Sequence, residues 1–143
     1  MSADFKELIK FSDDIKKLND EHKEVFLQQC AKELAARLLA KVIKRTPSDG
    51  GTLRRGWTAG KNQNATAYAN SLAIKHTGDK YIIDIVNPVE YASYVEYGHR
   101  TRNHQGWVQG HFMLMISEAE LNNVSDAILQ KKLNKYLKDV FGQ

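Results

Sequence analysis

The sequence predicts an α+β fold, in which a small antiparallel sheet packs against a long N-terminal helix and C-terminal helices, with a long extended loop. Three observations predict it: a helical apolar period up to residue 45, alternating apolar residues around 80–86, and a second helical period after residue 112. We expect one domain over residues 1–143, with N-terminal helices (3–45), a sheet region (52–87), a short helix (89–97), a protruding loop (98–111) and C-terminal helices (112–141).

The bulk properties are those of a soluble globular chain. A length of 143 residues is sufficient for a core, and no apolar run approaches the roughly 20 residues that span a bilayer. The N-terminus has no apolar h-region, so we expect no secretion signal. The single cysteine excludes an internal disulfide framework and fits a reducing cytosol. Because Cys30 lies on an apolar helix stripe, we expect a buried, inert thiol.

The net charge of +4 is unevenly distributed. Residues 25–60 carry seven Lys and Arg against two acids, whereas residues 1–24 carry five against seven. A basic sector of this size permits contact with nucleic acid or with an acidic partner but does not require either.

Two helices are expected before residue 46. The first spans about 3–18, and Asn19 then caps a second helix that runs to Arg45, where Pro47 stops it. The apolar stripe of this second helix consists of Leu27, Ala31, Leu34, Leu38 and Val42, widened by Ala35, Leu39 and Ile43.

The middle of the chain begins with the turn Pro47–Gly51. Leu53 and Trp57 then indicate either a short strand or a helical turn that enters the core. Residues 66–76 and 80–86 are expected to be strands joined by a hairpin-type turn at 77–79, with Asn87-Pro88 closing the second strand.

A short aromatic helix ends at Gly98, and a polar, basic loop follows. A loop of this length without periodicity is usually functional or disordered, so we interpret residues 98–111 as a presented arm. The chain then re-enters through Trp107 and Phe112, and a helix runs to about Leu121. Asn122-Asn123 would break or bend this helix. Ser125-Asp126 would then cap a new helix, whose apolar stripe contains Leu129 and Leu133.

No catalytic or metal-binding pattern is found. His99, His104 and His111 follow Glu96, but their spacing matches no standard zinc site, and Ser93 with His99 lacks an orienting group. No phosphate-binding loop is present, and carboxylates paired for acid–base chemistry are absent, because Asp84, Glu90 and Glu96 are expected on separate elements. We therefore expect no enzyme activity, no cofactor and no metal.

Arginine and aromatic residues offer two interpretations. Arg54, Arg55, Arg100 and Arg102, together with Tyr97 and Trp107, could track phosphates and stack on bases, but no nucleic-acid-binding signature accompanies them. The same residue types are preferred in protein–protein interfaces. We favour a protein interface and keep a basic nucleic-acid-binding module without catalysis as the alternative.

Two segments resemble the signatures of a known family. Thr46–Trp57 reads TPSDGGTLRRGW and resembles "TPVDTGxLRxSW", while Tyr91–Arg100 reads YASYVEYGHR and resembles "YAxYVEYGTR". Both are signatures of phage neck proteins, which are minor tail or tail-completion components of long-tailed bacteriophages and prophages. The apolar entry at Trp107–Leu114 is similar to the one that leads into the last helices of that family. The residues that match are Asp49, Leu53, Arg54, Trp57, Tyr91, Tyr94, Glu96, Tyr97 and Gly98.

The resemblance implies a non-enzymatic virion subunit at the head–tail junction that forms a ring around the DNA conduit. Its partners would be further copies of itself and neighbouring neck or tail proteins, with possible non-specific proximity to DNA and no membrane or small-molecule substrate. It would be found in the cytoplasm of the bacterial host during assembly and then in a virion or phage-tail-like particle. The chain departs from the signatures at Ser48, Gly50, Gly56 and His99, and its segment 102–110 is longer than usual.

The motif residues suggest roles. We expect Trp57, Tyr91 and Tyr94 to provide core or hinge packing, and Gly98 to adopt positive φ at the end of the aromatic helix. A pair between Glu96 and Arg54 or Arg55 would join the two motifs, and the arm would reach a neighbouring subunit.

Overall fold

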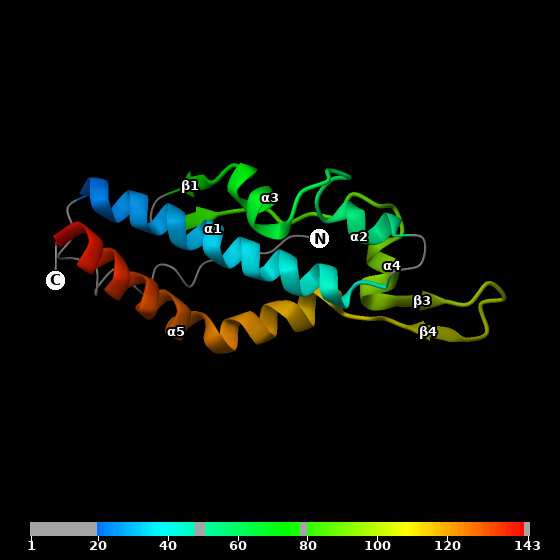
Figure 1. Cartoon of the computed structure of the whole chain (residues 1–143). Coiled ribbons are helices and arrows are strands. Elements are labelled where there is room, and N and C mark those ends of the chain that lie inside the picture. The colour runs from blue at the N-terminus through cyan, green and yellow to red at the C-terminus, as the bar shows by residue number, and fades with distance from the viewer. Residues whose placement is uncertain (1–19, 48–50, 78–79, 142–143) are drawn as a thin grey trace.

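The computed structural model describes residues 20–47, 51–77 and 80–141. Two long helices, α1 (Asp20–Arg45) and α5 (Met113–Phe141), lie side by side in antiparallel directions (Figure 1). The short elements pack around α1, and one β-hairpin projects beyond the helices at the end where α1 finishes and α5 begins. The predicted helix at 3–18 and the central part of the predicted turn, 48–50, lie outside the described residues.

Helix α1 confirms the predicted end at Arg45. Its apolar stripe is buried from Leu27 to Val42, and Lys44 and Arg45 lie in the last turn, where cations interact favourably with the helix dipole. The chain then continues through Thr46, whose hydroxyl donates to the carbonyl oxygen of Val42 at 2.6 Å.

Two short helices follow. Helix α2 (Thr52–Gly56) contains Leu53, so the helical-turn alternative is correct. Helix α3 (Ala65–Ser71) occupies residues 66–71 of the predicted strand 66–76, so the prediction is wrong there and holds only for residues 75–76. The side chain of Asn64 accepts a hydrogen bond from the N–H of Ala67 at 2.7 Å, and this N-cap starts a helix in an alanine-rich segment.

The first strand pair is short. Strands β1 (Lys75–Thr77) and β2 (Lys80–Ile82) are antiparallel, with Thr77 opposite Lys80. The predicted strand 80–86 ends early, because its pairing stops at Ile82. The alternation nevertheless persists in burial, since Ile83 and Ile85 are buried and Asp84 is exposed.

Of the two outcomes predicted at Asn122-Asn123, a break or a bend, the break is wrong, because helix α5 (Met113–Phe141) is continuous. Both asparagine side chains are exposed, and Ser125 donates to the carbonyl oxygen of Asn122 at 3.1 Å without starting a new helix. Figure 1 shows that the axis of α5 changes direction near its middle.

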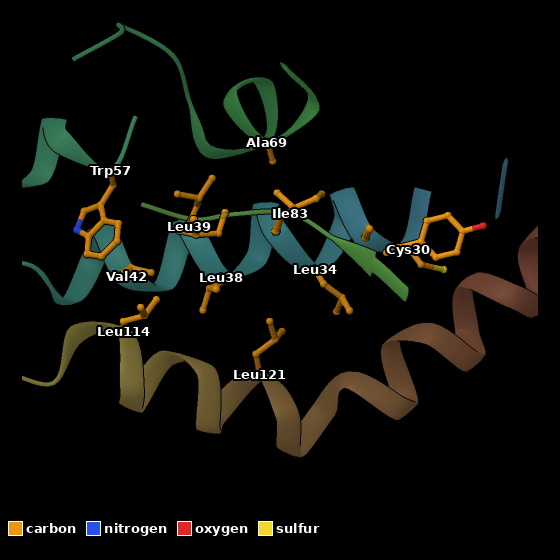
Figure 2. Close-up of a cluster of buried hydrophobic side chains, with 14 of the residues drawn as sticks. Cys30, Leu34, Leu38, Leu39, Val42, Trp57, Ala69, Ile83, Leu114 and Leu121 are labelled. Carbon is orange, nitrogen blue, oxygen red and sulfur yellow. The ribbon is translucent and has the colours of Figure 1, made fainter. Parts of the chain in front are cut away.

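The core forms along α1. Figure 2 shows Leu38 facing α5 with Leu114 and Leu121, while Leu39 lies on the side of Ile83. Trp57 is fully buried at the end of α1. Cys30 is also buried, as expected, and loss of hydration raises the pKa of its thiol to about 12.

The architecture is α+β, as predicted. In place of one small sheet, however, the described chain contains two separate two-stranded antiparallel sheets, β1–β2 and the hairpin β3 (Gly98–Arg100)–β4 (Trp107–Gln109). Among the described helices, none is both long and apolar enough to cross a membrane.

Candidate assembly surface at the β3–β4 hairpin

The segment predicted as a loop without structure of its own is a β-hairpin. Helix α4 (Ala92–Tyr97) confirms the predicted aromatic helix, and β3 follows it at once. Strands β3 and β4 pair with His99 opposite Val108 and Arg100 opposite Trp107. The absence of helical or long alternating periodicity concealed this hairpin, because each strand has only three residues. The hairpin does protrude, as Figure 1 shows.

The turn of the hairpin, Thr101–Gly106, is held by its own polar groups. The N–H of Thr101 donates to the carbonyl oxygen of Gly106 at 3.0 Å, and the N–H of Gly106 donates to the Thr101 hydroxyl at 3.1 Å. The side chain of Asn103 accepts from both the Thr101 hydroxyl and the N–H of Gln105. Such turns need no external contacts to define their shape.

Two glycines allow the base of the hairpin to close. Gly98 has φ +89°, which confirms the predicted positive φ, and a Cβ there would lie 2.4 Å from the carbonyl oxygen of Val108. A Cβ on Gly110 would lie 2.4 Å from the carbonyl oxygen of Glu96. Real Cβ atoms are not found at such distances, so both positions require glycine.

Glu96 fixes the hairpin to α5. Its side chain is buried, and its two carboxylate oxygens accept hydrogen bonds from the N–H groups of Leu114 at 2.9 Å and Met115 at 3.0 Å. These donors belong to the first turn of α5 and have no partner within the helix. The expected pair between Glu96 and Arg54 or Arg55 is therefore wrong, because the carboxylate serves as an N-cap supplied from a distant segment.

The backbone reinforces this connection. The N–H of His111 donates to the carbonyl oxygen of Val95 at 2.7 Å, and that of Phe112 donates to the carbonyl oxygen of Glu96 at 2.9 Å. Burial raises the pKa of Glu118, one turn further along α5, and the negative charge of Glu96 raises it further. Helix α4, the hairpin base and the start of α5 thus form one connected unit.

The first motif has a structural role at the end of α1. The indole N–H of Trp57 donates to the Thr46 hydroxyl at 2.9 Å, and Nε of Arg54 donates to the Thr46 carbonyl oxygen at 2.7 Å. The prediction that Trp57 packs in the core is confirmed. Arg55 is exposed on α2, and Asp49 lies outside the described residues.

Aromatic side chains are exposed on α4 and the hairpin. Tyr94 and Trp107 are each 60% exposed, and Tyr97 is 53% exposed. Tyr91 is exposed as well, so the expected core role of Tyr91 and Tyr94 is wrong. Helix α4 buries only Ala92 and Glu96, which leaves its tyrosines on the outer side.

Both faces of the hairpin carry large side chains. Directly paired residues project to the same face, so Arg100 and Trp107 share one face and His99 and Val108 share the other. The indole nitrogen of Trp107 lies over Gly98, 2.9 Å from where a Cβ would be. On the opposite face, the rings of His99 and Tyr94 have centroids 5.7 Å apart.

The structure therefore brings together only part of the predicted interaction set. Tyr97, His99, Arg100, Arg102 and Trp107 lie on or beside the hairpin, whereas Arg54 and Arg55 belong to α2 and Glu96 is internal. Sequence reasoning missed the exposure of Tyr94, Val108, Met115 and Ile116, which is evident only once the hairpin register and the side of α5 that faces α1 are known.

In the described residues, no group of three or more His, Cys, Asp or Glu side chains could hold a metal ion. His99 lies on β3, His104 in the turn and His111 beyond β4, so the three imidazoles belong to separate parts of the hairpin.

The described residues thus form an antiparallel helix pair with an attached hairpin that exposes aromatic side chains. Residues 9–98, more than half of the chain, match the family model described as "Bacteriophage HK97-gp10, putative tail-component". The chain belongs to this HK97-gp10-like family of phage tail components. Neither a curated protein nor a solved structure matches it significantly.

Proposed function

We propose that this tail component acts at the head–tail junction, as a neck or tail-completion subunit that assembles with further copies of itself around the DNA conduit. In this role the protein works through contacts and not through catalysis. The observation that carries the proposal is the projecting hairpin, with Trp107 60% exposed beside exposed arginines. Trp, Tyr and Arg are the residues that most often dominate binding energy in protein interfaces.

The way in which the hairpin is attached supports an assembly role. An interface element that is already ordered loses less conformational entropy on binding than a disordered arm does. Glu96 and the backbone bonds of His111 and Phe112 hold the hairpin in one orientation. We therefore propose that the projecting hairpin, with the exposed side chains Tyr94, Tyr97, Trp107 and Val108 distributed over its two faces and α4, contacts neighbouring subunits.

The test is the double substitution Tyr97→Ser/Trp107→Ser, which removes two exposed rings and no core contact. We expect helix content and melting temperature to stay close to those of the unsubstituted protein. Particles assembled with the variant should lack joined tails in electron micrographs. Val25→Ser is the matched control, because Val25 is also exposed (43%) and lies near the opposite end of α1.

Light scattering over a concentration series measures self-assembly directly. A ring-sized mass that the double substitution abolishes would support the proposal, and normal tail joining by the double variant would refute the hairpin as the assembly surface. If the mass changes only when DNA is added, and the change disappears at high salt, the alternative of a nucleic-acid-binding module is favoured.

A further inference from the structure

Two hollows lie in the seam between α1 and α5, and we refer to them together as the groove. The two helices are antiparallel (Figure 1), so the C-terminal part of α1 lies beside the beginning of α5 and the middle of α1 lies beside the middle of α5. The two hollows have volumes of about 430 and 570 Å³. The first is lined by Ala40, Lys41, Lys44, Arg45 and Glu120, and the second by Glu33, Arg37, Ala127, Ile128, Lys131, Lys132 and Lys135.

The groove has a large excess of positive charge. Its lining contains seven cations and two carboxylates. Glu33 pairs with Arg37 at 3.2 Å, and Glu120 pairs with Lys41 at 3.5 Å and with Arg45. The remaining four cations, Lys44, Lys131, Lys132 and Lys135, form no ion pair within the part of the chain that the structure describes.

Two of these lysines repel each other. Lys131 and Lys135 are four residues apart on α5, and like charges at this spacing lie on the same face and destabilise a helix. An anion placed between them would relieve the repulsion. The spacing corresponds to about 6 Å along the helix axis, and the part of α1 from Glu33 to Arg45 rises about 18 Å.

The remaining lining indicates what kind of anion fits. Apart from the half-buried Ile128, the apolar members are the alanines Ala40 and Ala127. An amphipathic acidic helix needs larger apolar anchors at regular spacing, which this groove does not offer. Lysines act as flexible point charges that suit phosphates irrespective of base sequence.

We propose that the groove between α1 and α5 binds the phosphate backbone of duplex DNA without reading its sequence. Its length corresponds to about half of one turn of the double helix. The proposal goes beyond assembly through the hairpin and concerns a second surface. It would stand even if the hairpin proved not to be the assembly site.

The test compares two double substitutions that remove the same charge. Lys131→Gln/Lys135→Gln changes the groove, and Arg100→Gln/Arg102→Gln changes the hairpin; all four side chains are exposed. Binding to a fluorescent duplex of about 30 base pairs is measured by anisotropy over a series of salt concentrations. The groove variant should lower the slope of log K against log salt by about 2 and weaken binding on the order of 10- to 100-fold at about 0.1 M salt. The hairpin variant should leave both nearly unchanged.

Several outcomes would overturn the proposal. The first is that the unsubstituted protein does not bind the duplex at low salt. The others are that both variants lose DNA affinity equally, or that only the hairpin variant loses it. Poly-L-glutamate is also tested as a competitor of the labelled duplex. If it displaces the duplex as well as unlabelled DNA of equal charge does, and Lys131→Gln/Lys135→Gln abolishes its binding, the groove binds an acidic protein segment instead. The variant Tyr97→Ser/Trp107→Ser should keep DNA affinity, so failure of hairpin assembly and failure of DNA binding are distinguishable.

Discussion

The carboxylate of Glu96 accepts a hydrogen bond from the backbone N–H of Leu114 at 2.9 Å, across eighteen positions of sequence. A second oxygen of the same carboxylate accepts from Met115. A residue at the end of α4 therefore caps α5, and the segment between them is constrained to form the hairpin. The second sequence motif is thus explained by packing inside the subunit as much as by contacts outside it.

Glu96→Ala should lower the free energy of unfolding by about 2–3 kcal/mol, because one buried and one partly buried N–H group at the start of α5 lose a charged acceptor. Urea unfolding followed by circular dichroism measures the change. Glu90→Ala is the control, since Glu90 is exposed, and it should change stability by less than about 0.5 kcal/mol. Equal effects of the two substitutions would contradict the capping role.

Trp57→Ala should cost about 3–5 kcal/mol, because the fully buried indole leaves a cavity at the end of α1. Thr46→Val should cost about 1 kcal/mol, since it removes the acceptor of the indole N–H. Denaturant titration gives both values. A loss below about 1 kcal/mol for Trp57→Ala would mean that the ring is not buried in solution.

Gly98→Ala should lower the melting temperature more than Gly60→Ala. Both glycines have positive φ, +89° and +75°, so an alanine is strained at either position. At Gly98 the new Cβ would also collide with the Val108 carbonyl oxygen, whereas nothing lies within 4 Å at Gly60. Differential scanning calorimetry tests the difference, and equal shifts would show that the hairpin base opens without cost.

Cys30 should react very slowly with Ellman's reagent in the folded protein at pH 8. Burial both blocks access and raises its thiol pKa to about 12, so little thiolate forms. In urea the reaction should become fast, as for an ordinary cysteine. Rapid labelling without denaturant would contradict the packing of α1 around Cys30.

Glu118→Gln should stabilise the protein at neutral pH. Burial and the charge of Glu96 raise the pKa of Glu118 in the folded state, so the unfolded chain loses this proton at lower pH than the folded chain does. Stability therefore falls as pH rises from the ordinary value of 4.5 through the raised folded value, and remains lower above it. The substitution removes this penalty, so its advantage in melting temperature should be present at pH 7 and vanish below about pH 4. A difference that does not depend on pH would refute this assignment.

Local signals predicted the long elements well. The stripe from Leu27 to Val42 and the stop after Arg45 required only periodicity and Pro47. The aromatic helix ending at Gly98 was equally clear. These signals depend only on neighbouring residues, so they can be recognised from a short segment of the sequence.

Signals that depend on distant partners were missed or misassigned. One local signal was also missed: residues 66–76 were predicted as a strand, but the N-cap at Asn64, three residues before Ala67, starts helix α3. The partner of Glu96 could not be read from the sequence, because Leu114 is distant along the chain and offers only a backbone N–H. The tyrosines of α4 were predicted to provide core or hinge packing. In the structure, the buried side of α4 carries Ala92 and Glu96 instead.

The rigid base of the hairpin has a geometric consequence. Gly98 and Gly110 bring two backbone segments together at the junction with α4, and Glu96 locks that junction to α5. The angle between the hairpin and the long helices is therefore an intrinsic property of each copy. In a head-to-tail assembly such an angle contributes to the rotation from one copy to the next, together with the position of the surface that receives the hairpin, and that rotation decides whether the chain of copies closes and after how many members. If the hairpin docks on a neighbour, the packing at these two glycines therefore influences the number of subunits in the closed circle.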